Sequence, residues 1–344
     1  MSPWRHPEAH NGCTRAAMLS KLTPALLQRV VQIVFALVCI FIGWRFYQFC
    51  VWAQTGAGDA VSRPAGVEGF LPISALLGLK HFILTGSYDP AHPAGLTILL
   101  FALCTGVLLR RGFCAYICPV GLISNLLAAA GRRLGLERRV PRMLDIAVKT
   151  LKYPLLAFFL FTVVVVMSGA ALQAFLMGRY NLTADAHLLR FFMSPSHTAL
   201  VVLGSLVAIS LLFRNAWCRW LCPYGALLGL LSWVGITNIR RTADACTGCQ
   251  SCQRVCPANI PIHEKTTIRT PECIGCARCV GSCSRQHALH VTVLGRPVHW
   301  AFLAVATVGL FLAFWLVAQL TGHWHSSLPP MMLKSLYAQA LGGM

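Results

Sequence analysis

One cysteine-rich stretch, residues 246–283, constrains this chain more than any other feature, because it carries nearly the same spacing twice. The first run reads C-x2-C-x2-C-x3-C-P. The second reads C-x2-C-x2-C-x3-C, with Ser284 where the first run has Pro257. Three thiols at this short spacing can reach three corners of one inorganic cluster from a single loop, whereas a zinc ribbon takes two C-x2-C pairs set apart. The spacing therefore favours two iron–sulfur clusters over a zinc site.

The pairing of the cysteines follows from how such double runs bind two [4Fe–4S] clusters, with the fourth cysteine of each run serving the other cluster. We therefore expect two ligand sets: Cys246, Cys249, Cys252 and Cys283 for the first cluster, and Cys273, Cys276, Cys279 and Cys256 for the second. Gly248 and Gly275 lie inside the loops, where a positive φ is easily adopted by glycine. The flanking residues 237–240 and 289–294 are prone to form strands and predict a small sheet.

The rest of the chain is apolar. Of 344 residues, 56% are hydrophobic and 11% are charged, which is typical of a membrane protein. Residues 53–93 are broken by proline and glycine and predict an interfacial or re-entrant segment. The expected fold is mainly α and polytopic, with an inserted α+β two-cluster module and about five transmembrane helices, at about residues 30–52, 94–109, 153–176, 197–213 and 300–320.

The charge of +19 indicates how these segments are oriented. Basic residues gather before the first span, in the loop 110–152 and around the clusters, so the positive-inside rule places these parts in the cytoplasm, where reducing conditions suit the clusters. We expect a multi-pass protein of the bacterial inner membrane. Its parts are a cytoplasmic segment (1–29), a membrane domain (30–235), a cytoplasmic ferredoxin domain (236–296), and a last helix with a periplasmic tail (297–344). No single basic face indicates nucleic acid.

The membrane domain also repeats itself, with an offset of 104 residues between the two copies of an apolar run that ends in C-x3-C-P. The motif cysteines are Cys114 and Cys118 in the first copy and Cys218 and Cys222 in the second. Both copies begin on the same side of the membrane, which predicts a parallel repeat and brings all four cysteines to one depth near the cytoplasmic face.

Cysteines at i and i+4 share a helix face, and Pro119 and Pro223 are expected to break the helix just after each pair. Three interpretations of the four cysteines stay open: a shared metal or iron–sulfur centre, a set of redox-active thiols, or buried structural cysteines. The remaining cysteines are scattered, and we expect them to fill apolar space (Cys13, Cys39, Cys50 and Cys104).

Together, the paired C-x3-C-P motifs and the two cluster runs resemble the membrane polyferredoxins of the NapH and NosR type, over about residues 29–320. The resemblance implies a quinol dehydrogenase, which passes electrons from the quinone pool through cytoplasmic clusters toward a periplasmic reductase system. Proteins of the NosR type also carry a periplasmic flavin-binding domain, for which we expect no counterpart here. A more distant likeness is to CcoG-type polyferredoxins, implicated in copper reduction.

We therefore expect a membrane-bound iron–sulfur electron-transfer protein, placed between the quinone pool and a cytoplasmic or periplasmic redox partner. The alternative is a metal (copper) reductase, or an assembly or redox-sensing factor for a respiratory complex. Because quinol oxidation releases protons, we select Glu68, His92 and His197 as candidate proton acceptors on the outer side. The sequence contains no nucleotide-binding fingerprint, phosphate loop or C-x-x-C-H haem motif that would favour another chemistry.

Overall fold

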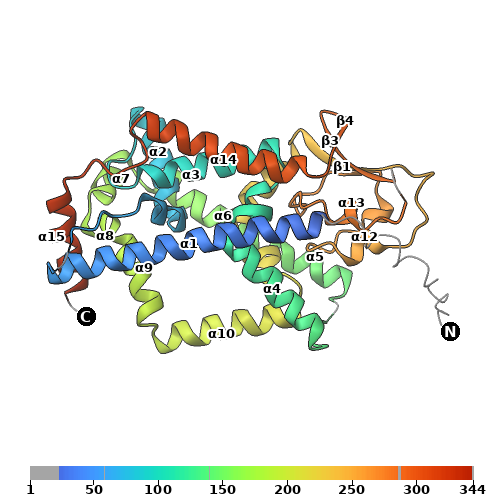
Figure 1. Cartoon of the computed structure of the whole chain (residues 1–344), viewed down its shortest axis with the longest axis horizontal. Helices are drawn as coiled ribbons and strands as arrows, with labels where there is room; N and C mark the ends of the chain where they lie inside the picture. Colours follow the sequence, from blue (N-terminus) through green and yellow to red (C-terminus); the bar gives the residue numbers. More distant parts are fainter. Residues whose placement is uncertain (1–22, 58, 139, 286–287, 343–344) are drawn as a thin grey trace.

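The computed structural model describes residues 23–57, 59–138, 140–285 and 288–342. The molecule is elongated and mainly helical, as predicted, with its small sheet at one end (Figure 1). The first helix, α1 (Pro24–Thr55), begins beside the sheet and runs to the opposite end of the molecule. There it packs against the last helix, α15 (Pro330–Leu341).

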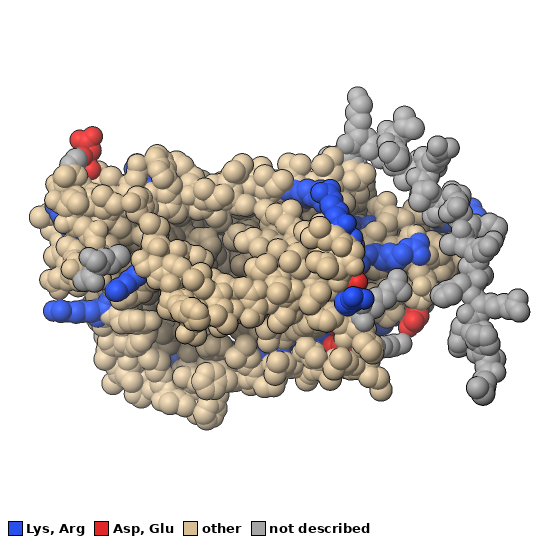
Figure 2. All heavy atoms as spheres, turned by 90° about the horizontal axis from the view of Figure 1, so that it is seen from below, with Lys and Arg blue, Asp and Glu red and all other residues tan. Residues whose placement is uncertain are grey.

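Among the described residues, three helical segments are long and apolar enough to cross a membrane: α1, the run Met143–Val166, and α14 (Phe302–Leu320). A fourth is added if α9 (Ala184–Met193) and α10 (His197–Leu212) form one span bent by 78°. Helix α3 (Pro93–Leu108) has 16 residues, so it is about 24 Å long. That is shorter than the ~30 Å hydrocarbon core. Five spans therefore stay a prediction. The face seen in Figure 2 has a wide uncharged middle, with lysine and arginine toward its two ends.

The third predicted span, 153–176, was wrong in its boundaries. The helical run begins earlier, with α5 (Arg142–Thr150) and α6 (Lys152–Phe161), and ends in a π-turn, η3 (Thr162–Val166). A separate helix, α7 (Gly169–Leu176), starts where the Ser168 hydroxyl accepts the N–H of Ala171. Lys80 of α2 (Pro72–Thr85) donates to the carbonyls of Val163, Val164 and Met167. These bonds satisfy backbone groups that the break leaves without helical partners.

The two sequence repeats have the same backbone. The first consists of α3, a π-turn η2 (Phe113–Ile117) and α4 (Pro119–Arg133), and the second of α10, a π-turn η4 (Trp217–Leu221) and α11 (Pro223–Trp233). Each repeat packs into the other, because α3 lies against α11 and α4 against α10. A Cβ on Gly131 would lie 2.0 Å from the Leu211 carbonyl oxygen, and one on Gly235 would lie 2.8 Å from that of Val107. Glycine at both positions therefore allows the two repeats to approach closely.

The cluster module contains, in the described residues, a four-stranded antiparallel sheet in the order β2-β1-β3-β4. The predicted pairing of the flanking segments is confirmed, with Ile239 opposite Val291. Both side chains are buried in a core shared with several cluster cysteines. The strands are β1 (Thr237–Arg241), β2 (Thr267–Ile268), β3 (Leu289–Val293) and β4 (Arg296–Val298), and the short helices of the module are α12 (Ser251–Arg254), η5 (Ile262–Glu264) and α13 (Arg278–Gly281).

Two basic side chains attach this module to the membrane helices: Arg110, just after α3, and Lys152, the first residue of α6. Arg110 is fully buried, and its guanidinium donates to the carbonyls of Ser232 at 2.9 Å and Ile268 at 2.7 Å. Lys152 forms an ion pair of 2.6 Å with Glu272. Both basic residues belong to the region 110–152 from which the sequence predicts the orientation in the membrane. They also form contacts that join the cluster module to the membrane helices.

Candidate functional site

The eight cysteines of the module surround two small cavities in the combination that the predicted ligand sets require. Cys246, Cys249, Cys252 and Cys283 line one cavity, and Cys256, Cys273, Cys276 and Cys279 line the other. Each cavity thus takes three cysteines from one run and the fourth from the other run. Helices α12 and α13 each carry the third cysteine of their run.

The loops have the backbone that such wrapping needs. Gly248 and Gly275 have φ values of +69° and +72°, as predicted, and Gln250 and Ala277 follow at +58° and +55°. Within the described residues, no three His, Cys, Asp or Glu side chains converge closely enough to hold a single metal ion. Three thiols from one loop and a fourth from the other run form the donor pattern of a two-cluster ferredoxin.

The electrostatics of these thiols also fit a cationic iron cluster. Burial raises the pKa of Cys256 to about 12, and the neighbouring Cys276 raises it as well. The backbone N–H of Ile260 partly offsets this by bonding to the Cys256 sulfur. A thiol buried beside other thiols ionises when bound metal compensates the negative charge. The Cys256 thiol is therefore suited to iron–sulfur ligation and poorly suited to a free thiolate.

A second group of cysteines lies in the membrane domain. Cys114, Cys118, Cys218 and Cys222 all line one cavity of about 340 Å³. Burial raises the pKa of Cys118, and the neighbouring thiols of Cys114 and Cys218 raise it further, so cysteines of both repeats face one another. The sequence prediction that symmetry brings these four residues together agrees with this geometry.

The backbone around these cysteines differs from the expected α-helical turn. The N–H of Cys118 donates to the Phe113 carbonyl and that of Cys222 to the Trp217 carbonyl, which are the i to i+5 bonds of π-turns. Pro119 and Pro223 then occupy the first turn of α4 and α11. Proline follows each pair as predicted, but it starts a new helix there, because its missing N–H is not needed in a first turn.

Polar groups surround the four sulfurs. The Ser124 hydroxyl lies 3.3 Å from Cys218 Sγ, and the Gly225 N–H donates to Cys222 Sγ at 3.3 Å. Arg111, which is buried, places Nη2 at 3.9 Å from Cys114 Sγ. These donors favour negatively charged sulfur and are compatible both with a cluster and with redox-active thiols.

From the cysteines the cavity continues between mostly apolar side chains to a single buried carboxylate, Glu68. The wall of this cavity includes Leu99 and Phe311 from the membrane helices, and Pro257 and Glu272 from the cluster module. Glu68 lies on η1 (Ala65–Phe70) and is fully buried. One cavity therefore borders the C-x3-C-P cysteines, the module and a buried acid.

Glu68 belongs to a buried network at the end of the molecule opposite the sheet. Its Oε1 accepts from Arg63 Nη1 at 2.8 Å, and its Oε2 accepts from the N–H of Gly95 at 3.0 Å. Arg63 also donates to Asp185 Oδ2 at 2.8 Å and to His92 Nδ1 at 3.0 Å. One buried arginine thus connects two carboxylates and a histidine.

His92 is the group in this network that can change its charge most readily. Its Nε2 donates to the Asn181 carbonyl at 2.7 Å, and its Nδ1 is 3.8 Å from Glu68 Oε1. Burial opposes a charge on His92, but the Glu68 carboxylate outweighs burial and raises the pKa of His92. When His92 is neutral, the network holds one positive charge, on Arg63, and two negative charges, on Glu68 and Asp185. A proton on His92 therefore brings the net charge of the network to zero.

The other sequence-selected acceptor lies elsewhere. His197, the first residue of α10, is exposed, and it is not among the described residues that contact Glu68. Sequence reasoning did not select Arg63, Asp185 or Tyr337. Tyr337 of α15 belongs to the same network, because its hydroxyl donates to Asp185. A usable signal was that Arg63 and Asp185 stand in weakly charged stretches of sequence between the predicted spans.

Two family models match the chain over these regions. A "4Fe-4S binding domain" matches residues 91–137 and 196–241, which are the two C-x3-C-P repeats, and a "4Fe-4S dicluster domain" matches 238–284. The putative electron transport protein YccM of Escherichia coli is 33% identical over 324 residues, covering 91% of this chain and 90% of that protein. The chain belongs to the NapH-type polyferredoxins.

Other relatives of this polyferredoxin match a smaller part of it. The ferredoxin-type protein NapH of Escherichia coli is 27% identical over 187 residues, which is 52% of this chain and 60% of NapH. The methylamine utilization ferredoxin-type protein MauN of Methylorubrum extorquens is 29% identical over 204 residues, 55% of this chain and 62% of MauN. No solved structure matches. Iron–sulfur electron transfer is thus the function that the family shares.

Proposed function

We propose that this polyferredoxin oxidises a membrane quinol in the cavity that joins Glu68 to the four C-x3-C-P cysteines. The observation that carries the proposal is this cavity of about 340 Å³, which borders both a buried acid and the cysteines of both repeats. A quinol needs an apolar enclosure for its ring, a proton acceptor at its hydroxyl, and an electron acceptor nearby. The cavity supplies the first two directly.

The ring of the quinol is held by the apolar wall between α1 and α3, and the side chains there exclude water from the reacting oxygen. Glu68 accepts a proton from the quinol hydroxyl. His92, whose Nδ1 lies 3.8 Å from Glu68 Oε1, is the next acceptor once the two groups close to hydrogen-bond distance. Since the network of Arg63, Glu68, Asp185 and His92 becomes neutral with one added proton, the two protons of a quinol leave one after the other. His197, exposed on α10, is a candidate acceptor only for protons that have left the cavity.

The cysteines of the module are assigned as ligands of two [4Fe–4S] clusters, in the two sets that line the two small cavities. When bound, such clusters accept electrons one at a time, at potentials set by burial, charge and hydrogen bonds. The four C-x3-C-P cysteines line the quinol cavity together with residues of the module. They act either as ligands of a further centre or as redox cysteines that accept electrons in their disulfide form. The second ligand set lies near this cavity, because Pro257 and Glu272 line the cavity and are the sequence neighbours of Cys256 and Cys273.

We place the protein in the inner membrane of a bacterium with its cluster module in the cytoplasm. The support is the surplus of basic residues at the module end and the reducing conditions that such clusters need. The redox partner then receives or supplies electrons at the module.

The test is quinol-dependent reduction of anaerobically purified protein in lipid nanodiscs, followed by low-temperature EPR with iron and sulfide analysis. Wild type should show reduced-cluster signals after a quinol analogue as well as after dithionite. Glu68→Gln should slow the quinol reaction by roughly 100-fold, as expected for loss of a general base. Asp59→Asn, an exposed carboxylate of the same outer segment, is the matched control and should be unaffected.

A wild-type rate in Glu68→Gln would remove the acid from the mechanism. Reduction by dithionite but never by quinol would reject the quinol site, and reduction of cupric ion by the dithionite-reduced protein would then favour the metal-reductase alternative. Eight irons per chain account for the two clusters, and more iron assigns a further centre to the C-x3-C-P cysteines.

A further inference from the structure

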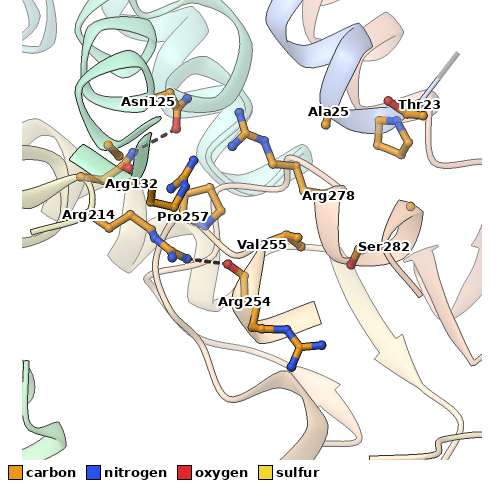
Figure 3. Close-up of a pocket in the computed structure, with 14 residues that line it drawn as sticks. Thr23, Ala25, Asn125, Arg132, Arg214, Arg254, Val255, Pro257, Arg278 and Ser282 are labelled. Atoms are coloured by element: carbon orange, nitrogen blue, oxygen red, sulfur yellow. Dashed lines mark hydrogen bonds between the residues drawn. The ribbon is translucent and has the colours of Figure 1, made fainter. Parts of the chain in front are cut away.

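A second cavity, of about 410 Å³, lies where the membrane helices meet the cluster module. Its wall combines the start of α1, the end of α4, the segment before η4, and the loops that carry the cluster cysteines. Figure 3 shows arginine side chains from these separate segments around one space. Neither the family models nor the quinol proposal assigns a role to this cavity.

The described charged residues that line this cavity are all positive. The arginines among the described lining residues are Arg132, Arg214, Arg254 and Arg278. Glu137 accepts from Arg214 Nη2 at 2.7 Å and lies 3.7 Å from Arg132 Nη1. The other bonds go to neutral groups: Arg278 Nε donates to the Gln28 amide oxygen at 2.6 Å, and Arg214 Nη1 donates to the Arg254 carbonyl at 2.7 Å. Among these described contacts, the one carboxylate, Glu137, lies near Arg132 and Arg214, and Arg254 and Arg278 bond to neutral groups.

Like charges that converge on one space favour a bound anion. Partial burial lowers the pKa of Arg132, whose side chain is 46% exposed, and the nearby Arg214 lowers it as well. The 32-residue helix α1 adds the positive end of its dipole, because Thr23, Pro24 and Ala25 at its start line the same cavity. Arginine forks and a helix start are also the donors that recognise phosphate oxygens in other proteins.

We propose that this cavity binds a phosphate group, and that the phosphate is the headgroup of an anionic phospholipid. At about 30 Å³ per water in the liquid, the volume has room for on the order of ten water-sized groups, which suits a phosphoglycerol headgroup. Beyond the cavity, Leu26, Val30 and Val34 of α1 expose 45%, 47% and 52% of their surface. These apolar side chains continue along a candidate membrane span and provide a surface for acyl chains, which a free phosphate would not use.

Binding would have a structural consequence for the electron-transfer part. Val255 and Ser282, which line the cavity, directly precede Cys256 and Cys283, one from each predicted ligand set. A phosphate bound there would contact α1, α4 and both cluster loops together, and would hold the module against the membrane helices. This inference is independent of quinol oxidation.

The experiment uses the full-length protein with its clusters, purified in detergent and depleted of lipid, and measures binding of phosphatidylglycerol by native mass spectrometry. Arg132→Gln and Arg278→Gln should each weaken binding about tenfold, as expected for loss of a charge-assisted hydrogen bond. Arg133→Gln is the control, because it removes the same charge from the next residue, which is also exposed but does not line the cavity. Iron content and elution volume verify that each variant is folded.

Two further arms separate the sources of phosphate. Phosphatidylcholine should bind more weakly than phosphatidylglycerol, because its choline cation is repelled by the arginines. Arg132→Lys, which keeps the charge but loses the planar fork, should be intermediate and serves if the glutamine variants do not fold. Binding of inorganic phosphate with the same arginine dependence, without binding of phosphatidylglycerol, would keep the phosphate site and overturn the lipid source. Equal affinity of phosphatidylglycerol for wild type and all variants would overturn the site itself.

Discussion

The two C-x3-C-P repeats have the same backbone but very different surroundings. In the first repeat, Ala94, Leu96 and Phe101 of α3 have no exposed surface, because α2, α11 and α14 pack around that helix. In the second, α10 packs mainly against α4, and Leu200 and Val201 each expose 54% of their surface. Figure 1 shows the same contrast, with α10 at the edge of the molecule and α3 inside it.

This difference shows that the repeat preserves the surroundings of the cysteines but not the surroundings of the helix starts. The cysteines lie where the repeats contact each other, so each copy supplies an equivalent part of one site. The helix starts lie at the other end, where the histidine of each copy meets whatever other elements pack there. His92 meets Arg63 and Glu68, whereas His197 meets solvent or lipid. The two copies should therefore behave alike near the cysteines and differently at the helix starts, where His92 precedes α3 and His197 is the first residue of α10.

The largest effect is expected at the cysteines and should be the same in both repeats. Cys114→Ser and Cys218→Ser should each slow quinol-dependent cluster reduction by more than the ~10–100-fold that loss of a supporting residue causes at a metal site. The reason is that the cysteines of both repeats line one cavity. Stopped-flow absorbance after addition of a quinol analogue measures it. A defect confined to one repeat would show that the cysteines do not act together.

The histidines should break the symmetry. His92→Gln should slow the same reaction by roughly 10- to 100-fold, toward the lower end of what an acid–base group contributes, because Glu68 remains in place. His197→Gln should leave the rate unchanged, because its side chain is exposed and takes no part in the described hydrogen bonds of the network. Equal defects in the two variants would mean that both helix starts handle protons.

Packing between the repeats should respond to glycine substitutions. Gly131→Ala and Gly235→Ala should each destabilise the protein by about 1–3 kcal/mol, because the new Cβ would overlap a carbonyl oxygen of the other repeat. Gly204→Ala on α10, where a Cβ would meet no atom within 4 Å, should be neutral or slightly stabilising. Thermal unfolding in detergent compares the three. A stable Gly131→Ala would show that the close approach of α4 and α10 is dispensable.

The smallest effect is on the pH dependence of stability. Because Glu68 raises the pKa of His92 above its usual value of 6.5, protonated His92 stabilises the fold below pH 6.5. That contribution is lost as the pH rises through the raised pKa, with a slope of at most about 1.4 kcal/mol per pH unit for one proton. Unfolding midpoints between pH 6 and 9 should fall less steeply in His92→Gln than in wild type. His197→Gln should follow wild type, and parallel curves for all three would contradict the assignment.

Local patterns in the sequence predicted most of the architecture. The cysteine spacing predicted which thiols share a cavity, the flanking strands were placed within one or two residues, and the repeat predicted the meeting of the four C-x3-C-P cysteines. The span at 153–176 was misplaced because hydropathy does not register the break at Met167, which depends on carbonyls satisfied by Lys80 from another helix.

The sequence alone determined the features that depend on neighbours a few residues apart: cluster-type cysteine spacing, apolar helices, and proline at the start of α4 and α11. Only the tertiary structure decided which charges are buried and what they face. Arg63 and Asp185 are 122 residues apart, and Arg110 and Ile268 are 158 apart, yet each pair is joined in the interior. Burial makes such contacts strong because water no longer competes for the charged groups. Burial is a property of the packed chain, so the buried network and the arginine cavity became visible only with the fold.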